Sequence, residues 1–214
     1  MEEPDATEIR VLGCLIEKQR TTPDVYPLSL NALRIACNQS TNRDPVVDYD
    51  EETVREALRR LALRGWTRLA SGSGSRARKY RHLFDDTHTP DETALLAVLM
   101  LRGVQTPGEL KQRTERMEGF ADLAAVNESL EKLIARGAVE RLTRRPGQKE
   151  ERYRHLLGGN GGGDSAAHVE AAEESPSPPS AESQPQDDRL SRLEAEVADL
   201  RRQVAALREA LDEQ

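Results

Sequence analysis

The feature that most constrains this chain is an internal repeat. The segment VLGCLIEKQRTTP aligns without gaps to LLAVLMLRGVQTP further along the chain. A second block, VREALRRLALRG, aligns to VNESLEKLIARG, and the two copies close on KYRHLF and RYRHLL. Three matching blocks in the same order indicate that one fold occurs twice. We therefore predict two successive domains, at residues 1–84 and 85–157.

Each copy has the pattern of three helices followed by a two-stranded ribbon. In the first copy, Asp5 and Glu8 have the spacing of a capping box, and apolar residues then recur at helical intervals. Ser29 is positioned to cap a second helix, and a third is expected from about Asp50 to Gly65. In the second copy, the start signals are TPDE and TPGE, and the third helix is expected to end at Gly137.

After the third helix of each copy, an extended run, a turn-rich tip and another extended run predict a β-hairpin. The tips are SGSGS in the first copy and Pro-Gly in the second. Three helices closed by a hairpin make a helix-turn-helix with a ribbon attached. The predicted fold is therefore mainly α with small β-hairpins, in two tandem winged-helix domains. Only the first copy has a long polar loop, between Cys37 and Asp50.

At that loop the residues resemble a known family. The runs CLIEKQRTTPDVYPLSLNAL, ACNQSTNRDPV and LMLRGVQTPGEL are closely similar to the YceH-like family of bacterial proteins. The similarity extends from about Ile9 to Leu157, over both repeats. The resemblance implies a tandem winged-helix fold and a bacterial origin. It carries over no activity, and hence no catalytic or binding residues.

The tail divides into a linker and a helix. Residues 158–188 are rich in Gly, Ser, Pro and Glu and almost free of apolar side chains, a composition typical of disorder. Residues 189–214 follow a heptad pattern with Leu, Val, Val and Leu at the a positions and Leu at every d position. Valine at a with Leu at d favours a parallel two-stranded coiled coil. We predict a homodimer through Leu190, Leu193, Val197, Leu200, Val204, Leu207 and Leu211. A lone amphipathic helix that docks on its own domains is the alternative.

The composition argues against several classes of protein. The two cysteines, Cys14 and Cys37, lie in apolar stretches, and no Cys/His spacing resembles a metal site. His82 and His155 occupy matching places in the two copies, which favours a structural role over catalysis. No nucleotide-binding loop or hydrolase motif occurs. We therefore expect no enzymatic activity, no cofactor and no metal. The chain lacks a membrane-spanning stretch and a signal peptide, so we expect it in the cytoplasm.

The net charge of −7 is unevenly distributed. Residues 1–84 carry 14 Lys and Arg against 12 Asp and Glu, residues 85–157 carry 12 against 13, and residues 158–214 carry 5 against 13. Within the first copy, residues 57–84 include eight basic residues and no acidic one. Basic ribbons suit contacts to phosphate, with double-stranded DNA as the expected partner. The candidate nucleic-acid-binding residues are Arg55, Arg59, Arg60, Arg76, Arg78, Lys79, Arg81, Arg144, Arg145 and Lys149.

The acidic residues at the start of each third helix argue against DNA binding. In the first copy this turn reads Asp50-Glu51-Glu52, and carboxylates there repel phosphate. A helix-turn-helix normally presents this turn to the major groove. We therefore expect DNA, if it is bound, to meet the ribbons and the later part of the third helix. The alternative function is a protein-interaction scaffold that binds no DNA.

Overall fold

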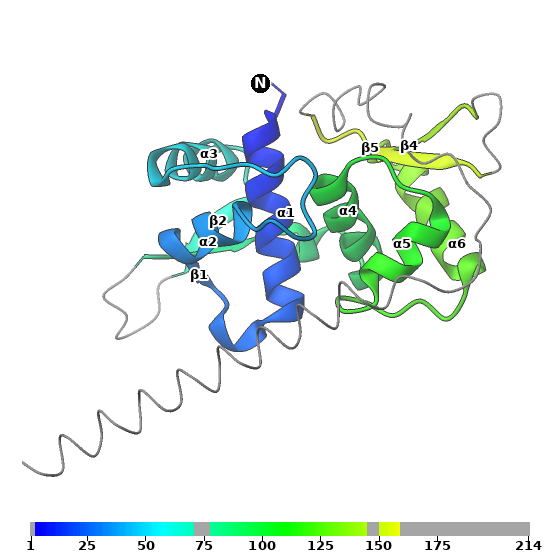
Figure 1. The fold of residues 1–214 in the computed structure, drawn as a ribbon, viewed down its shortest axis with the longest axis horizontal. Coiled ribbons are helices and arrows are strands. Elements are labelled where there is room, and N and C mark those ends of the chain that lie inside the picture. The colour runs from blue at the N-terminus through cyan, green and yellow to red at the C-terminus, as the bar shows by residue number, and fades with distance from the viewer. Residues whose placement is uncertain (1–2, 71–77, 145–149, 159–214) are drawn as a thin grey trace, which may run out of the picture. The chain divides into compact units, whose positions relative to one another are not determined.

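The computed structural model describes residues 3–70, 78–144 and 150–158. In these ranges the protein is mainly helical and has a few short antiparallel strands, which confirms the predicted fold class at this level (Figure 1). The predicted linker beyond Gly158 and the predicted coiled coil at 189–214 lie outside the described residues. No helix of the described ranges is long and apolar enough to cross a membrane.

The first half contains three α-helices and a three-stranded sheet. In chain order its elements are α1 (Ala6–Thr21), the 3-10 helix η1 (Pro23–Val25), β1 (Leu28–Ser29), α2 (Leu30–Cys37), α3 (Glu51–Leu63), β2 (Thr67–Ala70) and β3 (Lys79–His82). The strands are antiparallel in the order β1-β3-β2. A second 3-10 helix, η2 (Phe84–Asp86), leads into the second half.

The second half repeats this order of elements. It consists of α4 (Pro90–Arg102), α5 (Pro107–Thr114), α6 (Leu123–Ala135), β4 (Val139–Leu142) and β5 (Arg152–His155). Strands β4 and β5 form an antiparallel pair. In place of β1, the residue Gln105 forms an isolated bridge to Tyr153.

Local signals in the sequence place the helix ends correctly. The capping boxes at Asp5 and Thr106 form as expected, and Ser29 caps α2 by accepting a hydrogen bond from the Ala32 backbone N–H. After α3 and α6, Gly65 and Gly137 adopt φ values of 73° and 69°. This left-handed conformation favours glycine, so both helices end where the sequence indicates.

Two features of the first half differ from the prediction. Its ribbon has three strands instead of two, because Leu28 and Ser29 pair with Tyr80 and Lys79 of β3. The Thr-Pro match between the copies also has two structural outcomes. Thr106 caps α5 directly, whereas Thr22 precedes η1, and α2 begins only at Leu30. The extra residues of the first copy form the third strand.

The two halves pack against each other through their first helices. Helices α1 and α4 lie side by side, and most residues of α4 are buried (Figure 1). Gly13 of α1 faces α4 so closely that a Cβ atom there would lie 3.0 Å from the Leu101 side chain. A small residue is therefore needed at this point of the helix contact. One continuous apolar core extends across both halves.

The long polar loop of the first copy, between α2 and α3, is fixed by the buried Arg43. The Arg43 side chain is fully buried, where it pairs with Glu17 (Nη2–Oε2 2.6 Å) and donates to the Ala36 carbonyl (3.0 Å). The loop also reaches the second half, since the Asp44 backbone N–H donates to the Leu101 carbonyl (2.8 Å). The idiosyncratic loop therefore helps to join the two halves.

An ion pair to a buried glutamate occurs at the same place in both halves. Glu8 of the α1 capping box is 1% exposed and pairs with Arg64 at the end of α3 (Oε1–Nε 2.9 Å). In the second half, the fully buried Glu92 pairs with Arg136 at the end of α6 (Oε2–Nη1 3.0 Å). The pairs tie the start of the first helix to the end of the third in each copy. The residues that form them match in the sequence repeat.

Candidate nucleic-acid interface

The first ribbon presents one basic face and one buried face. Thr67 and His82, which are Cα partners across β2 and β3, are both buried. Because side chains alternate along a strand, the next pair, Arg68 and Arg81, lies on the opposite face. Lys79 lies on this same face, two residues from Arg81. We call Arg68, Lys79 and Arg81 the ribbon triad.

The ribbon triad has no acidic partner among the described residues. None of its three side chains, nor the exposed Arg78 beside them, forms an ion pair with a carboxylate in those ranges. Like charges directly opposite on antiparallel strands destabilise the pair. Arg68 and Arg81 are in that position, so this face is suited to a polyanion that supplies the missing negative charge.

The buried face of the ribbon holds the triad in place. The His82 backbone N–H donates to the Tyr26 hydroxyl (2.8 Å), and the His82 Nδ1 accepts from the Phe84 backbone N–H (3.2 Å). The His82 Nε2 contacts the side-chain oxygen of Gln19 on α1. Burial lowers the pKa of His82 to about 4, so the imidazole is neutral at pH 7. Strand β3 is thereby anchored to α1.

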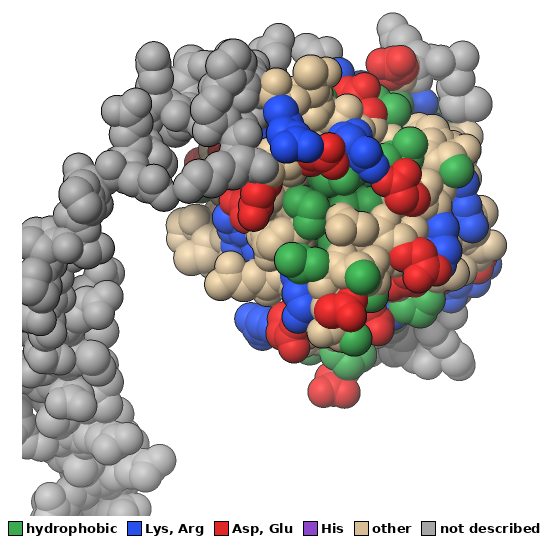
Figure 2. Space-filling model, turned by 90° about the vertical axis from the view of Figure 1, so that its right-hand side faces the viewer, with side chains coloured by type: hydrophobic (Ala, Val, Ile, Leu, Met, Phe, Trp, Pro, Cys, Tyr) green, Lys and Arg blue, Asp and Glu red, His purple; other side chains and the backbone are tan. Residues whose placement is uncertain are grey.

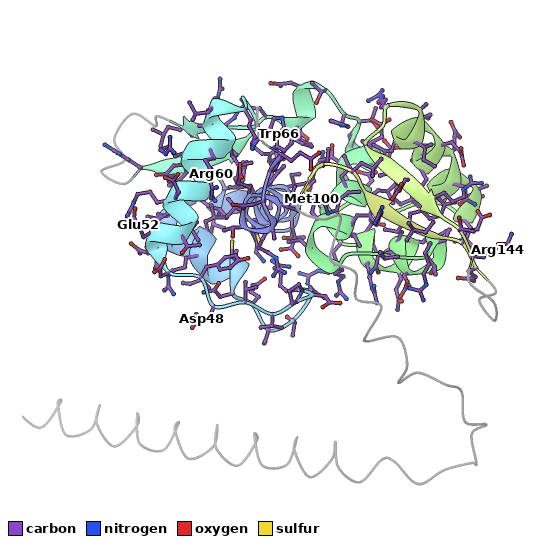
Figure 3. All side chains as sticks on the ribbon, turned by 90° about the horizontal axis from the view of Figure 1, so that it is seen from above. Asp48, Glu52, Arg60, Trp66, Met100 and Arg144 are labelled. Atoms are coloured by element: carbon purple, nitrogen blue, oxygen red, sulfur yellow. The ribbon has the colours of Figure 1, made fainter. Side chains whose placement is uncertain are left out.

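The second ribbon carries a similar number of basic residues, but acidic residues pair with them. Arg154 pairs with Glu140, Arg141 with Glu131 and Glu151, Arg144 with Glu151, and Arg152 with Glu109. Figure 2 shows the face of the molecule on the second-half side, where basic and acidic side chains are interspersed. Figure 3 shows Arg144 at the outer end of this half. The second half therefore has a ribbon of the same form as the first, but the described basic residues of the second ribbon are paired with carboxylates.

Arginines of α3 also form ion pairs with carboxylates. Arg55 pairs with Glu51 and Glu52, Arg59 with Glu56, and Arg60 with Asp5 (Nη2–Oδ2 2.8 Å). Glu52 points outward from the first turn of α3, and Arg60 lies further along the same helix (Figure 3). Exposed pairs of this kind are weak and exchange easily. They nevertheless leave α3 with no net basic face.

The structure thus separates the predicted binding residues into three groups. Arg78, Lys79 and Arg81 lie on the first ribbon without a described ion pair, whereas Arg55, Arg59, Arg60 and Arg144 are paired. The remaining predicted residues, including the coiled-coil positions, lie outside the described residues: Arg76, Arg145, Lys149, Leu190, Leu193, Val197, Leu200, Val204, Leu207 and Leu211. The prediction omitted Arg68. Its place opposite Arg81 depends on strand register, which the composition of the basic run does not reveal.

Within the described ranges, no group of three or more His, Cys, Asp or Glu side chains is arranged to hold a metal ion. Cys14 and Cys37 are free and buried, as predicted for small core residues. His82 and His155 are both buried in their strands.

Comparison with known proteins places the chain in a bacterial family defined by sequence. Residues 5–148 match the family described as "Protein of unknown function, DUF480". The chain is 50% identical to a UPF0502 protein of Pelobacter propionicus over 97% of this chain and 94% of that protein. It is 43% identical to the UPF0502 protein YceH of Salmonella typhimurium, with 96% of each chain covered. The chain belongs to this DUF480 (UPF0502) family, as its sequence motifs indicate.

Proposed function

We propose that each half is a winged helix and that the chain binds double-stranded nucleic acid through the first ribbon. The order of three helices and a closing antiparallel ribbon supports the winged-helix assignment. A ribbon of this kind approaches the phosphate backbone beside the helix-turn-helix. In this proposal the second half supports the first and makes no comparable phosphate contact.

The observation that carries the proposal is the opposed pair Arg68 and Arg81. Two guanidinium groups on facing strands repel each other, and no described carboxylate offsets them. A phosphate placed between them accepts charge-assisted hydrogen bonds from both. Lys79 and Arg78 extend the positive charge along β3.

The proposed binding is independent of base sequence. The first turn of α3 carries exposed Glu51 and Glu52 behind the capping carboxylate of Asp50. Such a turn is repelled by phosphate and finds a suitable donor only on cytosine. The ribbon triad therefore supplies affinity, and affinity that depends on phosphate contacts falls steeply with salt.

The proposal is tested by fluorescence anisotropy of a labelled random-sequence duplex titrated with the full chain over a range of salt concentrations. We expect Arg68→Ala with Arg81→Ala to weaken binding roughly tenfold at low salt. The slope of log affinity against log salt should fall by about 1.8, because each phosphate contact contributes about 0.9. The matched control is Arg141→Ala with Arg154→Ala, which removes the same charge from the second ribbon and should change both values far less.

Equal effects from the two double variants would mean that only overall charge matters and that no specific phosphate contact exists. Absence of binding by the folded wild-type chain at low salt would refute nucleic-acid binding. It would favour the alternative, a scaffold that binds other proteins through the same two halves. Circular dichroism of each variant establishes that the comparison is made between folded proteins.

We also propose that the chain dimerises through the heptad pattern of residues 189–214. Introducing charge at two d positions, Leu200→Lys and Leu207→Lys, should shift sedimentation equilibrium from dimer to monomer, because lysine is poorly tolerated inside a coiled-coil seam. The control is Ala198→Lys with Ala205→Lys, at outward b positions of the same heptads. A wild-type chain that sediments as a monomer, or equal effects of both variants, would contradict the coiled coil.

A further inference from the structure

A cavity lies where the two halves meet, away from the ribbon triad. Its volume is about 570 Å³, and it is lined by the start of α1, the loop before α3, the end of α4 and His155 of β5. Met100, one of its lining residues, lies between the two halves in Figure 3. The apolar part of the lining includes Pro4, Ile9, Val47, Tyr49 and Met100. This volume and lining are those of a site for a small organic molecule.

Arg10 lines this cavity as a buried charge that has no counter-ion among the described residues. The residue is 4% exposed, and its guanidinium donates to the carbonyls of Cys37 (3.3 Å) and Pro45 (2.6 Å). No carboxylate of the described residues forms an ion pair with it, in contrast to Arg43 nearby, which pairs with Glu17. Two of its five N–H groups are thus accounted for by protein acceptors. A buried guanidinium that lacks a carboxylate partner favours the binding of an anion.

His155 also lines the cavity, but one of its ring nitrogens is enclosed by the protein. It is 2% exposed, and in the part of the chain that the structure describes its Nδ1 has no hydrogen-bond partner. Burial, together with the neighbouring Arg154, lowers the pKa of His155 to about 4, so the ring is neutral at pH 7. Its counterpart in the first half, His82, has partners at both ring nitrogens. In the first half the Nδ1 of His82 accepts a hydrogen bond from the Phe84 backbone N–H, whereas the corresponding atom of His155 has no such partner among the described residues.

We propose that this cavity binds a small organic carboxylate with an apolar body. The carboxylate accepts hydrogen bonds from the Arg10 guanidinium. The apolar body packs against Val47, Tyr49 and Met100. Glu3, Asp5 and Asp44 also line the cavity, and their negative charges repel anions, most strongly those with more than one negative charge, such as phosphate esters.

The proposal is independent of nucleic-acid binding, because the cavity uses no residue of the ribbon triad. Its residues come from both halves, so a bound ligand stabilises their contact. A ligand that binds only the folded state raises the melting temperature, and the rise grows with the logarithm of ligand concentration once the site is mostly filled. The consequence is measurable on the full chain without nucleic acid.

The test uses three monocarboxylates as probes: benzoate, phenylacetate and 4-methylvalerate. Each is titrated into the full chain by isothermal calorimetry, with thermal melts in parallel. Benzamide, the neutral isostere of benzoate, and benzylamine, a cation of similar size, serve as ligand controls. We expect at least one carboxylate to bind and to raise the melting temperature, and benzamide to bind at least about tenfold more weakly than benzoate.

Two neighbouring loop residues provide matched protein variants. Val47 lines the cavity, whereas Val46 is 58% exposed and does not. Val47→Phe should fill the cavity and abolish carboxylate binding, and Val46→Phe should leave it unchanged. Arg10→Met should weaken binding at least about tenfold if it folds, since the charge is lost. Failure of all three carboxylates to bind the wild type, equal binding of benzamide, or unchanged binding to Val47→Phe would each overturn the proposal.

Discussion

Lowering the pH from 7 to 4.5 is expected to destabilise the protein by roughly 5 kcal/mol through two buried histidines. His82 and His155 are both buried, and each has its pKa lowered to about 4 from an ordinary value of 6.5, chiefly by burial. The unfolded chain therefore binds more protons than the folded chain between these two values. Stability that is fully present above pH 6.5 is lost as the pH falls toward 4.

Urea denaturation of the full chain at several pH values between 7 and 4.5 measures this effect. In parallel, the imidazole NMR signals of His82 and His155 in the folded chain should stay constant down to about pH 5 and titrate near pH 4. In His155→Gln, the dependence of the unfolding free energy on pH in this window should fall by about half, because one of the two groups is removed.

A flat unfolding free energy between pH 7 and 5 would contradict the expectation. So would NMR titration of both rings near pH 6.5, which would mean that the buried rings take up protons without cost. Ordinary carboxyl groups titrate at lower pH than the upper part of this window, so their contribution is separable.

Replacing Arg64 by methionine is expected to lower the unfolding free energy by about 3 kcal/mol. Methionine keeps apolar contacts beside Trp66 but leaves the Glu8 carboxylate, which is 1% exposed, without its close partner. The remaining cation is Arg60, whose Nε lies 3.9 Å from Glu8 Oε2. A buried charge that loses its partner is costly, whereas the pair itself adds little over an apolar substitute.

The matched control is Arg59→Met, on the exposed side of the same helix. Arg59 pairs only with Glu56 among the described carboxylates, and its side chain is 62% exposed. The urea midpoint of the Arg59→Met variant should therefore stay close to that of the wild type. Urea midpoints measured together for both variants decide the matter. A similar small shift in both would show that Glu8 is solvated well enough without Arg64.

Much of the secondary structure follows from residues close together in the chain. The capping box at Asp5, the Ser29 cap and the terminal glycines Gly65 and Gly137 all act within a few residues of a helix end. Local hydrogen bonds and backbone sterics determine these features, which is why sequence patterns predict them. The sequence pattern does not predict strand β1, because two residues are too few to show the alternation of apolar and polar residues that marks a strand. These two residues form a strand only because they pair with β3.

The candidate interface was predicted only in part, because charge in a sequence does not reveal its partners. The basic run identified Arg78, Lys79 and Arg81, yet gave equal weight to Arg144, which pairs with Glu151. Arg68 is a candidate binding residue only because it lies opposite Arg81 on the facing strand. Cross-strand and interhelical neighbours depend on register and packing, which residues far apart in the chain decide.

The sequence by itself determined the repeat, the helix boundaries, the closing ribbons and the family, since these depend on local pattern and on similarity along the chain. Tertiary structure alone decided which charges are neutralised. It paired Glu8 with Arg64 across 56 positions of the chain, and left Arg68 and Arg81 opposed. It also brought Arg10 of the first half and His155 of the second to one cavity. Electrostatic and packing interactions act through space, so their outcome becomes fixed only when the chain has folded.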